Sequence, residues 1–202
     1  MPAAPRSPAD RRAQILDVAM RLLDSVPFEQ LSMDQVAAEA GVSSPLLFHY
    51  FKNKHGFRNA VLEASATELQ RRMTPDTSLP LPAQLRAGVE TFAEAVIAHP
   101  AIYLAVMRMA GSGDDGMRKI YRGMRRTFTQ EIGRALAQVG VSTTPALEAA
   151  IQGWQAFMEE IVLSWVDHPT MSRSEMIDLC ERGLYCLLPA AGVDHGIRLE
   201  DG

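Results

Sequence analysis

Apolar residues recur at helical spacing along almost the whole chain, and no stretch shows the two-residue alternation of a half-buried strand. In the first such stretch Ile15, Ala19 and Leu22 fall on one side of a helix that is predicted over 9–25. Gly, Pro and other turn residues separate it from further predicted helices over 33–39, 45–51, 54–72, 83–98, 101–110, 116–138, 145–167 and 172–188. We therefore expect an all-α protein of about nine helices.

The stretch from Thr74 to Pro82 is the richest in turn residues, and it predicts a boundary between two domains. Residues 1–74 would form the first domain and residues 75–202 the second. A chain of 202 residues is long enough to bury a core without disulfides or metals.

The charge of the chain excludes a non-specific polyanion binder and leaves room only for a local anion site. The net charge is −4, from 20 Lys+Arg and 24 Asp+Glu. Residues 1–74 carry 9 Lys+Arg and 8 Asp+Glu, so the acidic excess lies in the remainder.

The cysteines and the hydropathy pattern predict a cytoplasmic protein. Cys180 and Cys186 are six residues apart in a predicted helix, on different faces, which places them beyond disulfide reach. The N-terminal residues lack the apolar region of a secretory signal, and no apolar run approaches 18 residues.

The segment 31–54 carries the functional signal. Ser32 followed by Gln35 predicts a capping box at a helix start, and Gly41 supplies the positive φ that ends this helix after two turns. Ser43 or Ser44 would cap the next helix, in which Pro45 suits the first turn. Two short helices joined in this way predict a helix-turn-helix, whose second helix enters the DNA major groove.

The second of these helices is predicted to have a core face and a DNA face. Leu47, Tyr50 and Phe51 share the core face, and the outward residues that could contact bases or phosphates are Ser44, Pro45, Phe48 and His49. Lys52 and Lys54 flank Asn53, the expected cap of the following helix, and with the helix N–H groups they could hold a phosphate; Ser32 could hold a second. A competing interpretation is an all-α protein that never touches DNA, with Phe48 in its core.

The segment resembles the tetracycline-repressor (TetR) family of bacterial transcription regulators. The resemblance covers about residues 9–60 and lies in Ser32–Ala37, Ala40–Ser43 and Leu47–Lys54. It implies a homodimer that represses genes and releases DNA when a small molecule fills the C-terminal domain. The DNA contacts that it implies are Ser32, Ser43, Ser44, Pro45, Phe48, His49 and Lys54. The family usually has Tyr where this chain has Phe48, so one phosphate contact is expected to be weaker.

The second domain is expected to hold an effector pocket and a dimer interface. The resemblance implies that the last two helices pair across a two-fold axis, with interface residues Ile161, Trp165, Ile177, Cys180, Gly183, Leu184 and Leu187. Flexible Met and aromatic side chains suit a pocket of irregular shape, although ordinary core filling explains each of them equally well. The candidates for this pocket are Phe92, Tyr103, Met107, Tyr121, Met124, Phe128, Trp154, Phe157 and Met158.

No sequence motif points to catalysis, a metal or a cofactor. The chain has no phosphate-binding glycine loop and no metal-ligand spacing, and its five His are scattered. Arg118, Arg122, Arg125 and Arg126 fall on one side of a helix. They form either a solvated basic face or, for some of them, partners of an anionic effector or of acidic groups near the first domain. We expect no enzyme but a DNA-binding regulator whose partners are a DNA operator, a small-molecule effector and a second copy of the chain. The alternative is an all-α small-molecule-binding protein that has lost DNA binding.

Overall fold

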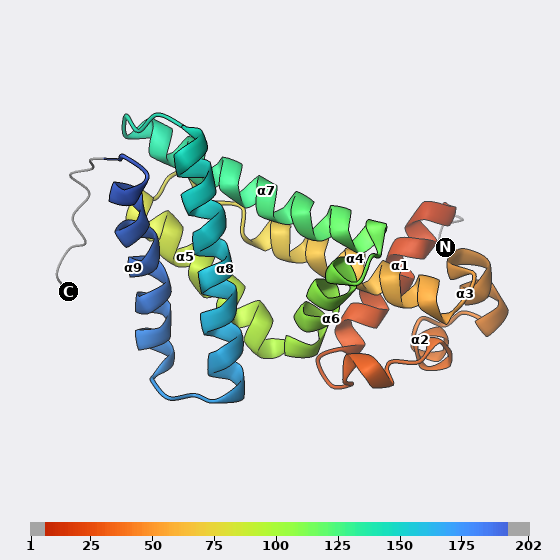
Figure 1. The fold of residues 1–202 in the computed structure, drawn as a ribbon. Helices are drawn as coiled ribbons and strands as arrows, with labels where there is room; N and C mark the ends of the chain where they lie inside the picture. The colour runs from red at the N-terminus through yellow and green to blue at the C-terminus, as the bar shows by residue number, and fades with distance from the viewer. Residues whose placement is uncertain (1–6, 194–202) are drawn as a thin grey trace. The chain divides into compact units, whose positions relative to one another are not determined.

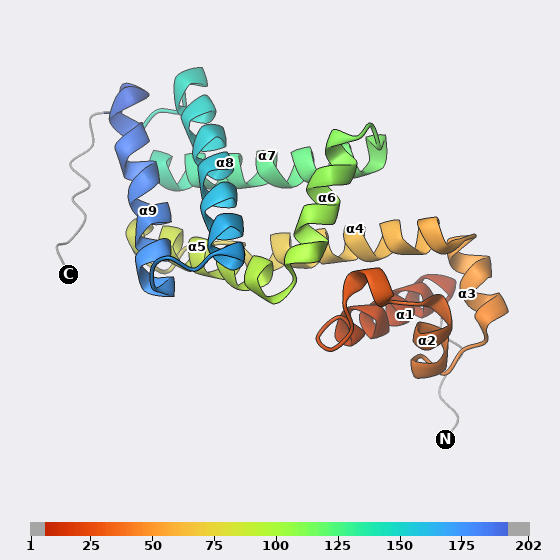
Figure 2. The same cartoon turned by 60° about the horizontal axis from the view of Figure 1, so that its bottom comes forward.

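The computed structural model describes residues 7–193, which form nine α-helices and one 3-10 turn without any strand (Figures 1 and 2). The all-α prediction is confirmed. In chain order the elements are α1 (Pro8–Leu22), η1 (Phe28–Gln30), α2 (Met33–Glu39), α3 (Ser44–Phe51), α4 (Lys54–Arg72), α5 (Leu81–Ala98), α6 (Pro100–Gly111), α7 (Asp115–Gln138), α8 (Pro145–Asp167) and α9 (Arg173–Ala190).

Side-chain caps fix where several of these helices begin. Ser7 and Asp10 form a reciprocal capping box at α1, and Ser172 and Glu175 form another at α9. Thr144 accepts a hydrogen bond from the backbone N–H of Leu147 at 3.1 Å and so caps α8. Each cap satisfies an N–H group that the helix itself cannot.

Helix α1 ends at Leu22, three residues before the predicted end at residue 25. The backbone N–H of Val26 donates to the Leu22 oxygen at 2.8 Å, so the chain already turns before Pro27. Phe28 then lies buried in η1, with the Arg58 guanidinium 4.2 Å from its ring centre. The sequence did not predict this 3-10 turn.

The chain divides into two compact units. Within the described residues the first unit comprises 7–68 and 101–118, and the second comprises 69–100 and 119–193. Residues 101–118 belong to the first unit, although the sequence grouped them with the second domain; the functional boundary at 74/75 stays a prediction. The first core is centred on Ile15, Val36, Leu47, Phe57 and Val61, and the second on Val89, Leu147, Ile151, Met176 and Leu188.

The second unit is organised around a hairpin of α8 and α9, which run side by side (Figures 1 and 2). The Trp154 indole N–H donates to the Cys180 carbonyl at 2.7 Å and joins the two helices inside the core. A methyl group on Gly183 would come within 2.7 Å of the Phe157 ring, so glycine permits the close approach here. No single described helix is long and apolar enough to cross a membrane. The bent pair of α5 and α6 together reaches the required length and composition.

Candidate nucleic-acid interface

Helices α2 and α3 form the predicted helix-turn-helix. The Ser32 hydroxyl accepts from the Gln35 N–H at 3.1 Å, which caps α2. Among the contacts of the described residues, the return bond from the Gln35 side chain that would complete a capping box does not occur. Gly41 has φ of +64°, so the left-handed turn residue is confirmed. Ser43 is the N-cap residue of α3 but makes no side-chain capping bond.

Helix α3 has the two faces that the sequence predicts. Leu47 and Phe51 are buried, but Tyr50, which was predicted on the same core face, is only half-buried. Pro45 and His49 are exposed, and Phe48 keeps 48% of its surface accessible. Phe48 is therefore not a core residue, which removes the main structural argument for the competing interpretation. A large apolar side chain held outward on a helix-turn-helix has an apolar partner in the thymine methyl group.

The Ser44 hydroxyl donates a hydrogen bond to the Asp34 carboxylate at 2.6 Å, and this bond joins α3 to α2. The sequence analysis missed Asp34, because no pattern links residues ten positions apart in adjacent helices. A hydroxyl has one proton to donate, and the Ser44 hydroxyl uses it in the hydrogen bond to Asp34. Toward an outside partner the Ser44 oxygen can only accept.

A tight turn connects α3 to α4. Lys52 has φ 65° and ψ −47°, and the Asn53 N–H donates to the Phe51 oxygen at 2.8 Å, which is a γ-turn of the strained, positive-φ kind. Lys52 is the only residue other than glycine with positive φ within residues 7–193. The sequence analysis missed this turn, because lysine at positive φ has no sequence signal.

Asn53 caps α4 as predicted: its side-chain oxygen accepts from the Gly56 N–H at 2.8 Å. The turn also fixes the residue type at 56, since a methyl group there would lie 2.3 Å from the Phe51 carbonyl oxygen. Lys52 and Lys54 are both exposed beside the start of the helix. The helix N–H groups that Asn53 does not use, together with the two adjacent cations, can bind an anion such as a phosphate.

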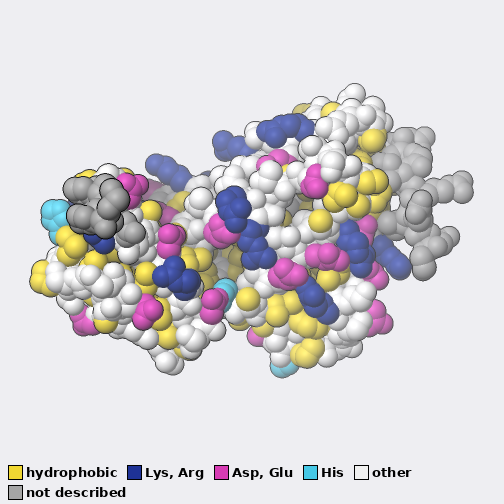
Figure 3. All heavy atoms as spheres, turned by 180° about the vertical axis from the view of Figure 1, so that it is seen from behind, with side chains coloured by type: hydrophobic (Ala, Val, Ile, Leu, Met, Phe, Trp, Pro, Cys, Tyr) yellow, Lys and Arg dark blue, Asp and Glu magenta, His cyan; other side chains and the backbone are white. Residues whose placement is uncertain are grey.

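All eight predicted DNA contacts are at least partly exposed and lie in α3, at the N-caps of α2 and α3, or in the turn and first residue that lead into α4: Ser32, Ser43, Ser44, Pro45, Phe48, His49, Lys52 and Lys54. Their roles in binding stay predictions. Figure 3 shows Lys and Arg side chains interspersed with Asp and Glu on the face that it presents. This distribution favours a few placed cations over a continuous basic surface.

The second unit contains two adjoining hollows of about 430 and 450 Å³. Phe128, Trp154 and Met158 line the larger one, as predicted. Phe92 and Met124 are buried but line neither hollow, and Tyr103 and Met107 belong to the first unit. Gln84 and Glu131 also line both hollows, and no apolar pattern in the sequence points to these polar residues.

Phe157 lines neither of these two hollows; it is 37% exposed on α8 and packs against Gly183 of α9. Tyr121 also lines neither hollow, and its hydroxyl donates to the Glu159 carboxylate at 2.8 Å. Burial and the Glu159 charge raise the pKa of Tyr121, so it remains a neutral donor.

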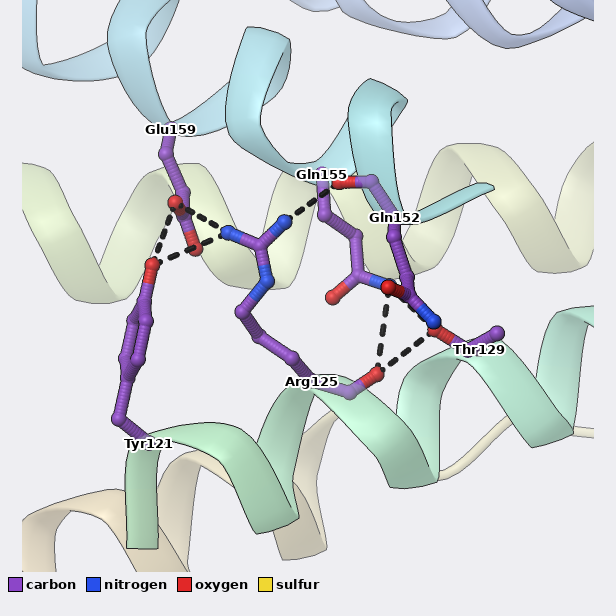
Figure 4. A network of polar contacts seen from close by, with 6 residues as sticks. All are labelled: Tyr121, Arg125, Thr129, Gln152, Gln155 and Glu159. Atoms are coloured by element: carbon purple, nitrogen blue, oxygen red, sulfur yellow. Dashed lines mark hydrogen bonds and ion pairs between the residues drawn. The ribbon is translucent and has the colours of Figure 1, made fainter. Parts of the chain in front are cut away.

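Arg125 is a structural residue and does not form a solvated basic face. Its guanidinium extends from α7 to α8, where it donates to Glu159 at 2.7 Å, to the Tyr121 oxygen and to the Gln152 carbonyl (Figure 4). The Arg125 and Glu159 side chains are only 17% and 7% exposed. The solvated interpretation suits Arg122 and Arg126, which are exposed.

The predicted dimer interface mixes core and surface residues. Ile177, Cys180 and Leu184 are buried inside the protomer, so they belong to its core and cannot contact a partner directly. Ile161, Trp165, Gly183 and Leu187 remain partly exposed. Burial raises the pKa of the Cys180 thiol to about 11, which makes this thiol unreactive at neutral pH, whereas Cys186 is exposed. Within residues 7–193 no three His, Cys, Asp or Glu side chains are grouped to hold a metal ion.

Two family models match the chain. Residues 15–61 match the bacterial regulatory proteins of the tetR family, and residues 81–185 match the tetracycline-repressor-like C-terminal domain.

An uncharacterised HTH-type transcriptional regulator of Mycobacterium tuberculosis is 27% identical over 159 residues, which are 73% of this chain and 64% of that protein. The regulator EthR of Mycolicibacterium smegmatis is 35% identical over 99 residues, 46% of this chain and 44% of EthR. The chain thus spans less than two thirds of these relatives. The crystal structure of a tetR-family regulator from Streptomyces coelicolor has a TM-score of 0.78 at 25% identity, and the match covers 93% of this chain and 84% of that one.

Proposed function

Because this chain belongs to the TetR family of bacterial regulatory proteins, we propose that it represses transcription as a homodimer that binds a DNA operator and is released by a small apolar or amphipathic effector. The observation that carries the proposal is the outward Phe48 and His49 of α3 above the buried Leu47 and Phe51. Such a protein works in the cytoplasm, where the operator is. The family is one of regulators, and the proposal assigns the chain no catalytic role.

In the proposed complex α3 lies in the major groove and the start of α4 lies on the backbone. Lys52, Lys54 and the α4 N–H groups hold phosphates, which position the helix. Because Ser44 can only accept, it pairs with an amino group at a base edge, and the neighbouring Asp34 carboxylate favours cytosine, whose N4 donates. A two-fold dimer places two such helices about 34–36 Å apart, or a multiple of one DNA turn, on a pseudo-palindrome.

The experiment that tests DNA binding is retention of the DNA upstream of the chain's own gene at several salt concentrations. Binding to phosphates displaces counterions, so the logarithm of the affinity should fall steeply with the logarithm of the salt concentration. Absent or salt-insensitive retention would favour the alternative, a small-molecule-binding protein that has lost DNA binding.

Lys54→Ala and Ser44→Ala should weaken DNA binding in different ways. Lys54→Ala is expected to lower the affinity for all sequences by roughly tenfold and to reduce the salt slope by about 2, because each protomer loses one phosphate contact. Ser44→Ala should leave that slope unchanged and reduce the preference at one base pair of each half-site, at about 1–3 kcal/mol. The measurement is a titration of an operator and its single-base variants. A changed base preference in Lys54→Ala would contradict the proposed orientation of α3.

The exposed apolar face of α8 and α9 supports the homodimer. Phe157 and Leu179 are each 37% exposed, and Leu179, Gly183 and Leu187 follow one another at one-turn spacing along α9. Apolar side chains that two helices present together on a surface are typical of an interface.

Leu179→Arg should convert the dimer into monomers. A buried, unpaired guanidinium is expected to raise the dimer dissociation constant at least a hundredfold. Tight operator binding should also be lost, because a monomer contacts only one half-site. Light scattering after size-exclusion chromatography measures the mass. The matched control is Leu104→Arg, because Leu104 is 40% exposed on α6 and belongs to the first unit. If Leu179→Arg stays dimeric, the interface lies elsewhere.

Release by an effector requires that the effector bind the DNA-free conformation better than the DNA-bound one. The two affinities are then linked, and the operator weakens effector binding by the same factor by which the effector weakens operator binding. The hollows of the second unit, which are lined mostly by apolar side chains, offer such an effector a site.

A further inference from the structure

The two hollows of the second unit form one groove with a single charged group in its middle. They share the wall residues Pro75, Gln84, Leu85, Glu131 and Ile132. One hollow continues to Phe128, Trp154 and Met158, and the other to Leu136, Leu184 and Leu188. Glu131 is the only charged residue lining either hollow.

The Glu131 carboxylate is available to a ligand. Within residues 7–193 it has neither an ion pair nor a hydrogen bond, and the nearest compensating cation is Arg134, one turn along the exposed side of α7. Desolvation raises the pKa of Glu131 more than Arg134 lowers it. A cation that enters the groove would therefore stabilise the charged form of this carboxylate.

Two side-chain amides, those of Gln84 and Gln155, also belong to the lining of the groove. Gln155 uses its NH₂ group for the Thr129 hydroxyl at 2.9 Å and the Arg125 carbonyl at 3.3 Å (Figure 4). Gln84 donates to the Leu79 carbonyl at 2.7 Å. Both NH₂ groups donate to the protein, and the surface that lines the two hollows is almost wholly apolar.

We propose that the groove binds a lipophilic amine, whose protonated nitrogen pairs with Glu131 and whose apolar body fills one or both hollows. This rests on the proposed function, in that the amine is the effector that releases DNA. A carboxylate, sulfate or phosphate would be repelled by Glu131 and would lose its hydration in an otherwise apolar groove. Residues 75–202 carry 16 Asp+Glu against 11 Lys+Arg, and this excess also attracts cations.

The test compares three probes with one apolar body on the full-length protein: 4-phenylbutylamine, 4-phenylbutan-1-ol and 4-phenylbutyrate. Isothermal titration calorimetry should give the amine about tenfold higher affinity than the alcohol, and the carboxylate the lowest affinity. Glu131→Gln keeps the shape of the side chain and should lower the amine affinity about tenfold without changing that of the alcohol. The matched control, Glu160→Gln, changes an exposed carboxylate of α8 and should leave all three affinities unchanged.

Three results would overturn the inference: equal affinities of the three probes, an amine affinity that Glu131→Gln does not lower, or no binding at millimolar concentration. The same protein is tested for operator retention with and without the amine. Retention that no amine affects overturns the effector role, whereas amine binding by a protein that retains no DNA overturns the proposed function and leaves the ligand site standing.

Discussion

Gly56→Ala is expected to lower the unfolding temperature of the protein markedly and to reduce the free energy of unfolding by about 3 kcal/mol. The added methyl group would lie 2.3 Å from the Phe51 carbonyl oxygen, and that oxygen is held by the Asn53 N–H in the turn between α3 and α4. The contact is with backbone on a strained turn, so no side-chain rotation relieves it. The variant should also lose operator affinity, because the same turn places Lys52 and Lys54.

The matched control is Gly123→Ala, which changes another glycine inside a helix. A methyl group on Gly123 meets nothing within 4 Å, so alanine should raise stability by about 0.5–1 kcal/mol through helix propensity. Both variants are measured by thermal and urea unfolding at one fixed protomer concentration, since dimer stability depends on concentration. Equal midpoints for Gly56→Ala and the unsubstituted protein would show that the turn relaxes without cost.

Arg125→Met should destabilise the second unit by about 3–5 kcal/mol. The substitution leaves the Glu159 carboxylate, 7% exposed, with the Tyr121 hydroxyl but without its cation, and it leaves the Gln152 carbonyl without this donor. A buried charge that loses its cation costs more than the pair contributes, because less of its desolvation is offset. Urea unfolding of the full-length chain measures the loss.

The double variant Arg125→Met/Glu159→Met separates the pair from the packing. It removes both charges, so most of the loss should be recovered, whereas additive losses would show that packing against α8 dominates. Arg122→Met is the control on the same helix; Arg122 is exposed, and its loss should change stability by less than about 0.5 kcal/mol.

Local features of the fold could be predicted from the sequence. The cap at Asn53, the left-handed Gly41 and the two faces of α3 each depend on residues within one or two turns, and all three are confirmed. The end of α1 differs from the predicted end, because the chain turns there and buries Phe28 in η1. Periodicity reports which side of a helix is apolar, and this was enough to define the nine helices.

Features that depend on contacts between distant residues could not be predicted. The Asp34–Ser44 bond, the Arg125–Glu159 pair and the place of Glu131 in an apolar groove all join different helices. An apolar stripe also cannot distinguish a face that meets its own chain from one that meets a partner. Cys180 and Leu184 were assigned to the interface for that reason, and they lie in the core.

The two tryptophans give the protein an intrinsic optical reporter. Trp154 is buried, lines the larger hollow and is held by the Cys180 carbonyl, whereas Trp165 is partly exposed and donates to the Met171 carbonyl at 2.8 Å. These are the only indoles in the chain. In a Trp165→Phe background the fluorescence would come from Trp154 alone, so occupancy of the groove could be followed as a change in emission without attaching any dye.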